Sequence, residues 1–175
     1  MDLQLINLIG AAAIAISDSI QNAAEESTGN TASFPAALVI VERYPTITVD
    51  LLAQYLQLSQ SGAARLVERL VNQNLVERQQ GNDRRCVHLQ LTSDGKAMVE
   101  KIQQTKIEAV SNLLKPLTAK EQQQLLIILS KMAGEYGNTE IMEEYICRFC
   151  DMNNCPLAVC QERLENWESK DSYSL

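Results

Sequence analysis

The sequence predicts a mainly α-helical protein with one small β-hairpin. Ala, Leu, Ile, Gln and Glu are abundant in the chain of 175 residues, which holds only seven Gly and four Pro. Apolar residues recur at helical spacing over most of the length, whereas CVHLQLT alternates apolar and polar residues as a strand does. Since 46% of the residues are hydrophobic, the chain can bury a core without disulfide staples.

The first predicted helix covers roughly residues 3–24, and EESTGNTAS after it is expected to form a turn. Its opening, MDLQLINLIGAAAIAIS, is strongly apolar, but no Lys or Arg precedes the apolar run as in a secretory signal. The run is also shorter than a membrane span and contains Gln4 and Asn7. We therefore expect a buried or interface helix in a cytoplasmic protein without a membrane partner, and an uncleaved export signal is the lesser alternative.

A helix in FPAALVIVERY, with Ser33 as its N-cap, is predicted next and ends before Pro45. Two short helices joined by a tight turn are predicted after it. Thr48 can cap a short helix in TITVDLLAQYLQL, and SQSGAARLVERLVNQNLV follows after almost no linker. This pair indicates a helix-turn-helix, in which the second helix enters the DNA major groove. The alternative is an ordinary helical hairpin with a solvated polar face.

The second helix of this pair carries residues suited to contacting DNA. Its first turn holds Ser59, Gln60 and Ser61, and Arg65 and Arg69 follow along the same side. Small polar residues permit close approach, Gln can read adenine edges, and Arg can reach guanine or phosphate. We therefore predict that these five residues contact DNA.

A two-stranded hairpin is predicted directly after the helix pair. NLVERQQ and CVHLQLT can form its strands around the turn GND. A hairpin in this place is a wing, and its tip holds Arg84 and Arg85, which suit the narrow minor groove. Asp83 is expected to hold these Arg side chains in place. We interpret Cys86 and His88 as plain strand residues of the wing.

The formal net charge of −7 argues at first sight against a polyanionic partner. The charges are unevenly placed, however. Residues 1–41 hold four acids and no base, whereas residues 42–90 hold six Arg against five acids. A weakly basic middle therefore lies between acidic ends, and DNA binding through the middle segment is compatible with the total charge.

The order of these elements resembles the multiple-antibiotic-resistance regulator (MarR) family of winged helix-turn-helix transcription factors, over roughly residues 30–135. The most specific stretch is NDRRCVHLQLTSDG, which is similar to the family's Asp-x-Arg wing followed by a strand, Leu-Thr and a Gly-containing helix start. The resemblance implies a homodimer with intertwined terminal helices on a pseudo-palindromic operator of double-stranded DNA. It also implies repression that a small-molecule or redox effector relieves.

The stretches after the wing accommodate such a dimer. SDGKAMVEKIQQTKIEAVSNLLKPL, capped at Ser93 or Asp94, and TAKEQQQLLIILSKMAGEYG, with a capping box of Thr118 and Glu121, predict two helices. Their apolar stripe is interpreted as core, so no effector residues are assigned. The expected organisation is an N-terminal dimerisation helix, a winged helix-turn-helix, dimerisation helices and a Cys-rich helical extension, at residues 1–30, 31–92, 93–137 and 138–175.

Four of the five cysteines lie within fourteen residues near the C-terminal end: Cys147, Cys150, Cys155 and Cys160. TEIMEEYICRF is expected to form a helix, DMNN a turn, and PLAVCQERLENWE a second helix, so the sulfurs can converge on the hinge of a helical hairpin. The spacing equals that of a zinc knuckle with Cys in place of its usual His. It predicts a zinc site, with an iron–sulfur cluster, reversible thiol oxidation or local packing as alternatives.

The sequence does not favour an enzyme. The one His lies beside the predicted wing, no phosphate-binding Gly loop occurs, and CRFC lacks the strand–helix alternation of a thioredoxin-type motif. The sequence therefore predicts a DNA-binding transcriptional regulator, and repressor activity is part of what the family resemblance implies. The alternative from another class is a dimeric winged-helix scaffold that binds protein and carries a structural zinc site.

Overall fold

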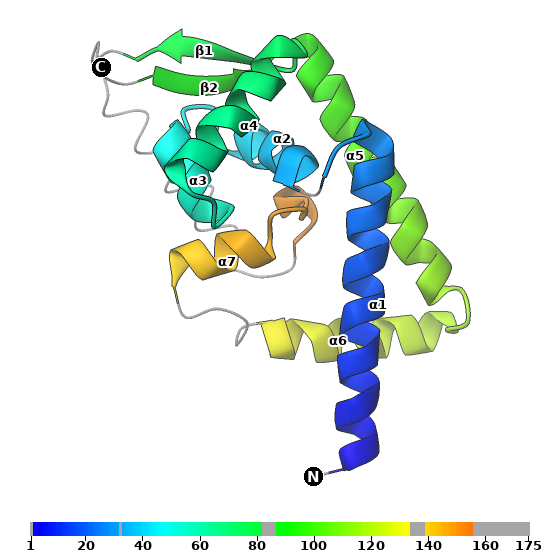
Figure 1. The fold of residues 1–175 in the computed structure, drawn as a ribbon. Helices are drawn as coiled ribbons and strands as arrows, with labels where there is room; N and C mark the ends of the chain where they lie inside the picture. Colours follow the sequence, from blue (N-terminus) through cyan, green and yellow to red (C-terminus); the bar gives the residue numbers. More distant parts are fainter. Residues whose placement is uncertain (1, 32, 82–86, 134–138, 156–175) are drawn as a thin grey trace.

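The protein is mainly helical, with an antiparallel hairpin at one end (Figure 1). The computed structural model describes residues 2–31, 33–81, 87–133 and 139–155. The elements in these ranges are α1 (Leu3–Thr28), α2 (Ser33–Arg43), α3 (Val49–Tyr55), α4 (Gln60–Asn72), β1 (Val76–Gln80), β2 (Val87–Leu91), α5 (Ser93–Leu114), α6 (Ala119–Ala133), α7 (Glu140–Ile146) and the short 3₁₀ turn η1 (Met152–Asn154).

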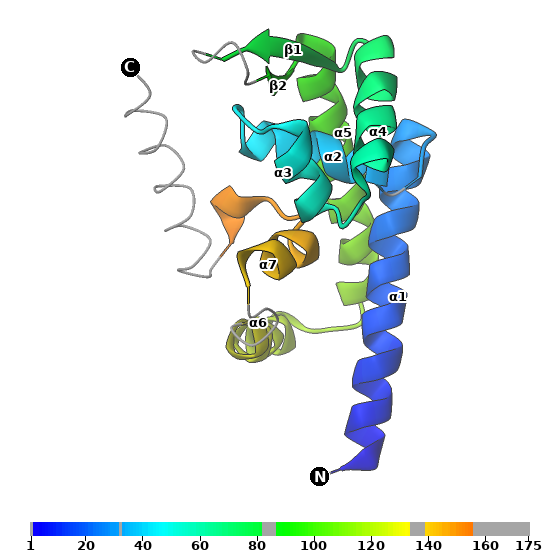
Figure 2. The same cartoon turned by 60° about the vertical axis from the view of Figure 1, so that its left-hand side comes forward.

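Helix α2 lies at the centre of the core. Every residue from Phe34 to Val41 is buried, so the helix must be covered on all sides. Helices α1, α3 and α5 and strand β2 pack around it (Figure 2). This arrangement confirms the predicted mainly helical fold with a small β-hairpin, and it fixes the winged region against the long helices.

Helix α1 is longer than predicted. It continues past Ala24 to Thr28 and ends at Gly29, whose φ of 65° lies in the left-handed region. The N–H of Gly29 donates to the carbonyl of Glu25 at 2.7 Å, which closes the helix in the way that favours glycine. Residues 25–28 (EEST), which were expected to lie in a turn, therefore belong to the helix. Lys101 of α5 donates to the carbonyl of Ser27 at 2.7 Å and ties the two helices together.

Helices α3 and α4 form the predicted helix-turn-helix. The hydroxyl of Thr48 accepts the N–H of Leu51 at 3.3 Å, and the hydroxyl of Ser59 accepts the N–H of Gly62 at 3.1 Å. Each side chain thus satisfies a backbone donor at the start of its helix. The inner face of α4 is buried, through Ala63, Leu66, Val67 and Leu70.

The predicted wing is present as the antiparallel pair β1 and β2, which runs from Val76 opposite Leu91 to Gln80 opposite Val87. Strand β2 also pairs with the segment before α3, because the N–H of Leu89 donates to the carbonyl of Ile47 at 2.9 Å. His88 is a strand residue, as predicted. The wing tip, including Asp83, Arg84, Arg85 and Cys86, lies outside the described residues.

Helix α5 begins one residue earlier than predicted. Its N-cap is Thr92, whose hydroxyl accepts the N–H of Gly95 at 3.0 Å, so the prediction of a cap at Ser93 or Asp94 was wrong. The same hydroxyl donates to the carbonyl of Asn74 at 2.6 Å. Thr92 therefore caps α5 and, with the same hydroxyl, holds the turn before β1.

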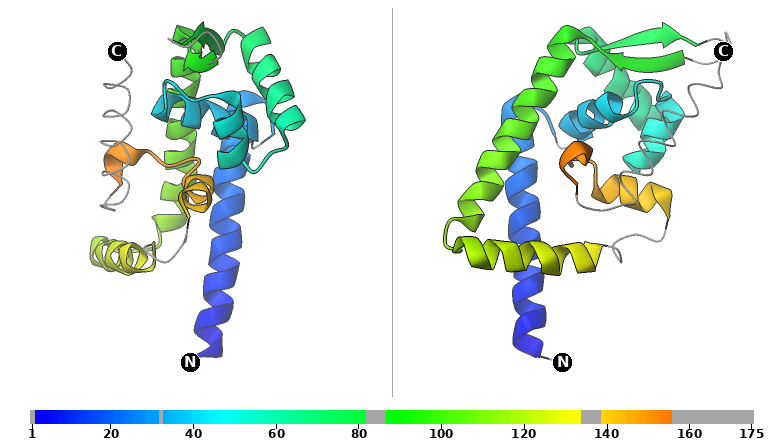
Figure 3. Two further views of the ribbon diagram at one scale, coloured as in Figure 1. Left: turned by 90° about the vertical axis from the view of Figure 1, so that its left-hand side faces the viewer. Right: turned by 180° about the vertical axis from the view of Figure 1, so that it is seen from behind.

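Helix α6 extends away from the winged region and has no buried residue. The left view of Figure 3 shows it well apart from α1. Its predicted capping box is confirmed: the Glu121 carboxylate accepts the N–H of Thr118 at 2.8 Å, and the Thr118 hydroxyl accepts the N–H of Glu121 at 3.4 Å. The Thr118 hydroxyl also donates to this carboxylate at 2.7 Å, and this hydrogen bond, together with the one from the Thr118 N–H, lowers the pKa of Glu121.

The predicted helix in TEIMEEYICRF is shorter than expected. Helix α7 ends at Ile146, and Cys147 is its C-cap. The N–H of Cys150 then donates to the carbonyl of Cys147 at 2.8 Å, which closes a turn in place of a further helical turn. Cys147 and Cys150 therefore lie at the two ends of a turn, and the predicted second helix lies outside the described residues.

Gly95 should be intolerant of a side chain, because a Cβ there would lie 2.0 Å from the carbonyl oxygen of Leu75. We expect Gly95→Ala to lower the free energy of unfolding by about 2 kcal/mol or more, as overpacking against backbone cannot relax easily. Urea denaturation measures this loss. Glu68→Ala, at an exposed position of α4, is the control and should be nearly neutral. Equal effects would contradict the proposed steric cause.

Candidate nucleic-acid interface and cysteine turn

The start of α4 presents a polar, exposed surface. Ser59, Gln60, Ser61 and Arg65 are all exposed, and the hydroxyls of Ser59 and Ser61 lie 3.4 Å apart. Backbone N–H groups and hydroxyls at a helix start can bind phosphate, and Gln and Arg side chains can read base edges. Four of the predicted DNA contacts thus share one accessible surface.

Arg69 is placed differently from the other predicted contacts on α4. Its guanidinium lies 5.2 Å from the centre of the Phe34 ring and donates to the side-chain oxygen of Asn30. A cation over an aromatic face is attracted by the ring's electron density. Arg69 therefore holds α4 to the α1–α2 connection in this structure, and its part in DNA binding stays a prediction.

The wing adds one basic residue that the sequence interpretation did not single out. Arg78 is exposed on β1, opposite Leu89 in the register of the hairpin. Strand alternation places Arg78 on the same face as the buried Val76, so alternation gave no signal for its exposure. The predicted contacts Asp83, Arg84 and Arg85 lie outside the described residues.

The described cysteines of the extension are thiols: Cys147, Cys150 and Cys155. Within the ranges that the structure describes, no group of three or more His, Cys, Asp or Glu side chains is arranged to hold a metal ion. Cys160, the fourth predicted ligand, lies outside those ranges. The site of zinc or of an iron–sulfur cluster on these four cysteines therefore stays a prediction.

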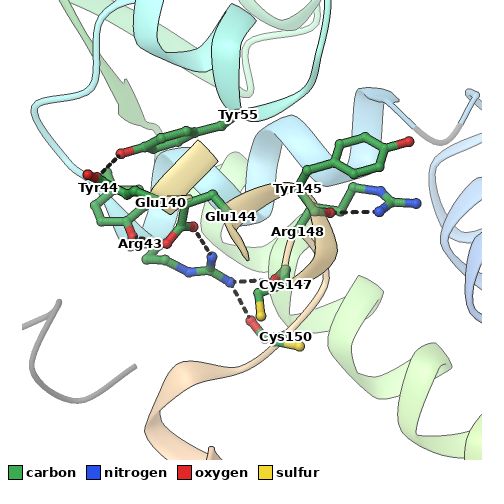
Figure 4. Close-up of polar contacts among 9 residues, drawn as sticks. All are labelled: Arg43, Tyr44, Tyr55, Glu140, Glu144, Tyr145, Cys147, Arg148 and Cys150. Carbon is green, nitrogen blue, oxygen red and sulfur yellow. Dashed lines mark hydrogen bonds and ion pairs between the residues drawn. The ribbon is translucent and has the colours of Figure 1, made fainter. Parts of the chain in front are cut away.

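A buried ion pair joins the extension to the winged region (Figure 4). Nη1 of Arg43, at the end of α2, lies 2.7 Å from Oε2 of Glu144 on α7, and the two side chains are only 4% and 1% exposed. The hydroxyl of Tyr44 donates to Oε1 of the same carboxylate at 2.7 Å. Both carboxylate oxygens are thus satisfied, as a buried charge requires.

The same guanidinium also holds the cysteine turn. Nη2 of Arg43 donates to the carbonyls of Cys147 and Cys150, each at 2.9 Å. From the other side, Nζ of Lys106 on α5 donates to the carbonyl of Phe149 at 2.8 Å. Two cations from the winged region and α5 therefore bind carbonyls of one short turn, and Figure 4 shows the contacts of Arg43.

These contacts change the acidity of groups around the turn. A hydrogen bond from Cys147 lowers the pKa of the Cys150 thiol to about 6, with help from the charges of Lys106 and Arg43, although burial acts in the opposite direction. Burial lowers the pKa of Lys106. Burial and the neighbouring Glu144 carboxylate raise the pKa of Tyr44.

A cavity of about 520 Å³ lies between α2, α5 and the cysteine turn. Its lining mixes apolar and polar groups, including Glu42, Gln103, Ile107 and Cys150. Burial, with the charges of Asp151 and Glu100, raises the pKa of Glu42. The cavity is large enough for a small molecule and brings Cys150 to its wall.

The residues that hold the extension were missed by the sequence interpretation. Arg43, Tyr44 and Glu144 stand in the segments VERYP and MEEYI, whose charged letters look like ordinary surface residues. Only the long-range contact shows that Glu144 is buried. No local pattern distinguishes it from its exposed neighbour Glu140, whose carboxylate accepts the Tyr55 hydroxyl at 2.9 Å.

The helix pair, the wing and the exposed start of α4 define a winged-helix DNA-binding protein. The sequence model of the MarR family matches residues 35–85, which include α3, α4 and β1. A similar protein is an uncharacterised HTH-type transcriptional regulator, YwhA, of Bacillus subtilis, 27% identical over 97 residues that make up 55% of this chain and 70% of YwhA. Residues 35–85 therefore resemble the MarR family, and the similar protein YwhA is described as a transcriptional regulator.

Solved structures share the fold. The apo form of MarR from E. coli is 27% identical, with a TM-score of 0.62, over 75% of this chain and 96% of MarR. Rv1404 from Mycobacterium tuberculosis is 20% identical, with a TM-score of 0.69, over 79% of this chain and 97% of Rv1404. Each alignment takes in nearly all of the other protein and leaves a fifth to a quarter of this chain outside.

Removing the Glu144 carboxylate should release α7 from the winged region. Glu144→Ala leaves Arg43 charged and without its buried partner, which costs about 3 kcal/mol or more. We expect the backbone amides of α7 to exchange with solvent correspondingly faster, as measured by native-state hydrogen exchange. Glu140→Ala is the control, because it removes only the exposed residue's contact with Tyr55, which is worth about 1 kcal/mol. Similar exchange in both variants would contradict a special role for Glu144.

Proposed function

We propose that the protein is a homodimeric repressor that binds a pseudo-palindromic operator in double-stranded DNA. The observation that carries the proposal is the exposed start of α4, with Ser59, Gln60, Ser61 and Arg65, beside an antiparallel wing. The match of residues 35–85 to the MarR family, and the similarity to the HTH-type regulator YwhA, support it. A structurally similar protein, a point mutant of MepR from S. aureus, was solved bound to an oligodeoxyribonucleotide; it is 19% identical, with a TM-score of 0.58, over 78% of this chain and 100% of MepR.

A second copy of the chain is the partner that fits the exposed apolar surface. The first half of α1 exposes Leu3, Leu5, Ile6, Leu8 and Ile9, which point in several directions around a helix with about 3.6 residues per turn. Helix α6 exposes a further apolar set, Leu126, Ile127, Ile128 and Leu129. Surface of this kind on several sides suits intertwined helices, because a flat partner would cover only one side.

The dimer also accounts for the apolar character of α1 in a cytoplasmic protein. By length and composition alone α1 could cross a membrane, and none of its most apolar window is buried within the chain. Its second half, however, packs along α5, where Thr105 donates to the carbonyl of Ala23 at 3.4 Å. A helix fixed to the winged region in this way is better suited to a protein interface than to a lipid one.

The cavity between α2 and α5 is the candidate site for a small-molecule effector. It adjoins the buried helix α2 and the helix α5 that follows the wing, so an occupant would contact both the DNA-binding region and the proposed dimer helices. A ligand that prefers one arrangement of these helices would shift the spacing of the two wings in a dimer.

Removing charge from the interface should weaken operator binding in a residue-specific way. Arg85→Ala should lower operator affinity and reduce the salt dependence, because a cationic contact in the minor groove is lost. Arg65→Ala should instead alter the preference among sequences, at a cost of about 1–3 kcal/mol for the preferred base. Fluorescence anisotropy with labelled duplexes over a range of salt concentrations measures both effects.

Arg69→Ala tests the predicted contact whose guanidinium packs on Phe34 in this structure. We expect it to lower stability more than affinity. If the Arg65 and Arg85 variants fold and bind every duplex as the natural protein does, α4 and the wing are not the DNA interface, and the scaffold interpretation replaces the present one.

Deleting residues 1–16 should disrupt the dimer, because it removes most of the exposed apolar surface of α1. We expect monomers or aggregates in multi-angle light scattering, whereas the full chain should show the mass of a dimer at micromolar concentration. A soluble dimer after the deletion would refute the assignment of α1 to the interface. Replacing Glu26 with Ala, at an exposed position near the end of α1, is the control and should leave the dimer intact.

A further inference from the structure

The turn between Cys147 and Cys150 has the geometry of a reversible disulfide site. The N–H of Cys150 donates to the carbonyl of Cys147 at 2.8 Å, which closes a four-residue turn. The ends of such a turn lie less than about 7 Å apart, within reach of the Cα separations found in disulfides. The Cys147 side chain is near enough to lower the pKa of the Cys150 thiol. A local adjustment of this turn is therefore enough to bring the two sulfurs to bonding distance.

The surroundings of the turn favour oxidation chemistry. Cys150 is exposed and lies on the wall of the cavity between α2 and α5, so a small oxidant can reach its sulfur. Cys147 is less exposed and stands beside it, in the position of a resolving thiol. The cationic groups of Arg43 and Lys106 both bind carbonyls of this turn, which places positive charge next to the sulfurs.

We propose that Cys147 and Cys150 form a reversible disulfide when the protein meets a hydroperoxide, and that Arg43 transmits this change to the winged region. The chemistry goes beyond the proposed function, and only its regulatory meaning rests on that function. Cys155 and the isolated Cys86 take no part in the bond.

The reaction proceeds in two steps. The sulfur of Cys150 attacks one peroxide oxygen, so that an S–O bond forms, the O–O bond breaks, and the leaving alkoxide takes up a proton as an alcohol, or as water when the oxidant is hydrogen peroxide. Cys147 then attacks the sulfenic sulfur of Cys150, so that the S–S bond forms and hydroxide leaves with the Cys147 proton as water. The two sulfurs lose two electrons, which the peroxide gains. A dithiol reductant reverses the bond.

Arg43 connects the turn to α2. Its Nη2 donates to the carbonyls at both ends of the turn, and its Nη1 pairs with Glu144. Drawing the two sulfurs to a bond length of about 2.05 Å fixes the side-chain torsions and shifts these carbonyls. The Arg43 contacts then weaken, and α7 is held less firmly against the end of α2.

The test uses the full chain as purified in the reduced state, without chelator, with its metal content measured first. Hydrogen peroxide and cumene hydroperoxide are added in stoichiometric steps, and peptide mass spectrometry locates the product. We expect a disulfide between Cys147 and Cys150 that a dithiol reverses. Hydrogen exchange on the same samples should show α7 amides exchanging about tenfold faster after oxidation, which corresponds to the loss of one charged hydrogen bond.

Single variants separate the roles of the thiols. Cys147→Ser should stop at a sulfenic acid on Cys150 that dimedone traps, whereas Cys150→Ser should give neither product. Cys155→Ser is the matched control and should oxidise like the natural chain. Because these measurements need no DNA, they stand whether or not operator binding is found.

Four results would overturn the proposal. One is stoichiometric zinc or iron that protects the thiols from both peroxides, which would favour the predicted metal site. Another is a disulfide that involves Cys155 or Cys160 in the natural chain. The third is oxidation of Cys150 to a sulfinic acid with no disulfide. The fourth is a Cys147–Cys150 disulfide that leaves the exchange of α7 unchanged.

Discussion

The burial of eight consecutive residues of α2, from Phe34 to Val41, is the constraint on which the rest of the structure depends. A helix that is buried from Phe34 to Val41 cannot stand alone in water, so α1, α3, α5 and β2 must all pack on it. The helix-turn-helix, the wing and the long helices are therefore parts of one core. At its end, Arg43 forms a strongly buried ion pair with Glu144, and so joins the cysteine turn to the same core.

This arrangement links three surfaces that face different partners. The exposed start of α4 is the proposed DNA surface. The exposed apolar residues of the first half of α1 and of residues 126–129 in α6 are the proposed dimer surface, and the cysteine turn borders a cavity beside α2. Because α2 and α5 belong to the core that joins these regions, a change at one can alter the others without a long chain of contacts. Two arrangements of the packed helices, each favoured by a different partner, are therefore enough to couple the three surfaces.

The sequence was informative where local chemistry decides the structure. Thr48 at a helix start, the alternation in VHLQL and the capping box of Thr118 and Glu121 are short-range signals, and each element formed as predicted. Helix ends were less predictable. Helix α1 continues to Gly29. Helix α7 stops at Ile146, because Arg43 and Lys106, which are distant in the sequence, bind carbonyls of the turn that follows it. The burial of Glu144 could not be foreseen, because it depends on Arg43, 101 residues away in the chain.

The central claim is that the winged region reads a specific DNA sequence as part of a dimer. Selection of binding sites from a pool of random duplexes, with the reduced full chain at physiological salt, tests it most directly. The account predicts enrichment of an inverted repeat whose half-sites are about one helical turn apart, since two wings related by a twofold axis would contact successive grooves. A pool that stays unenriched over repeated rounds, from a folded dimer, would contradict the claim.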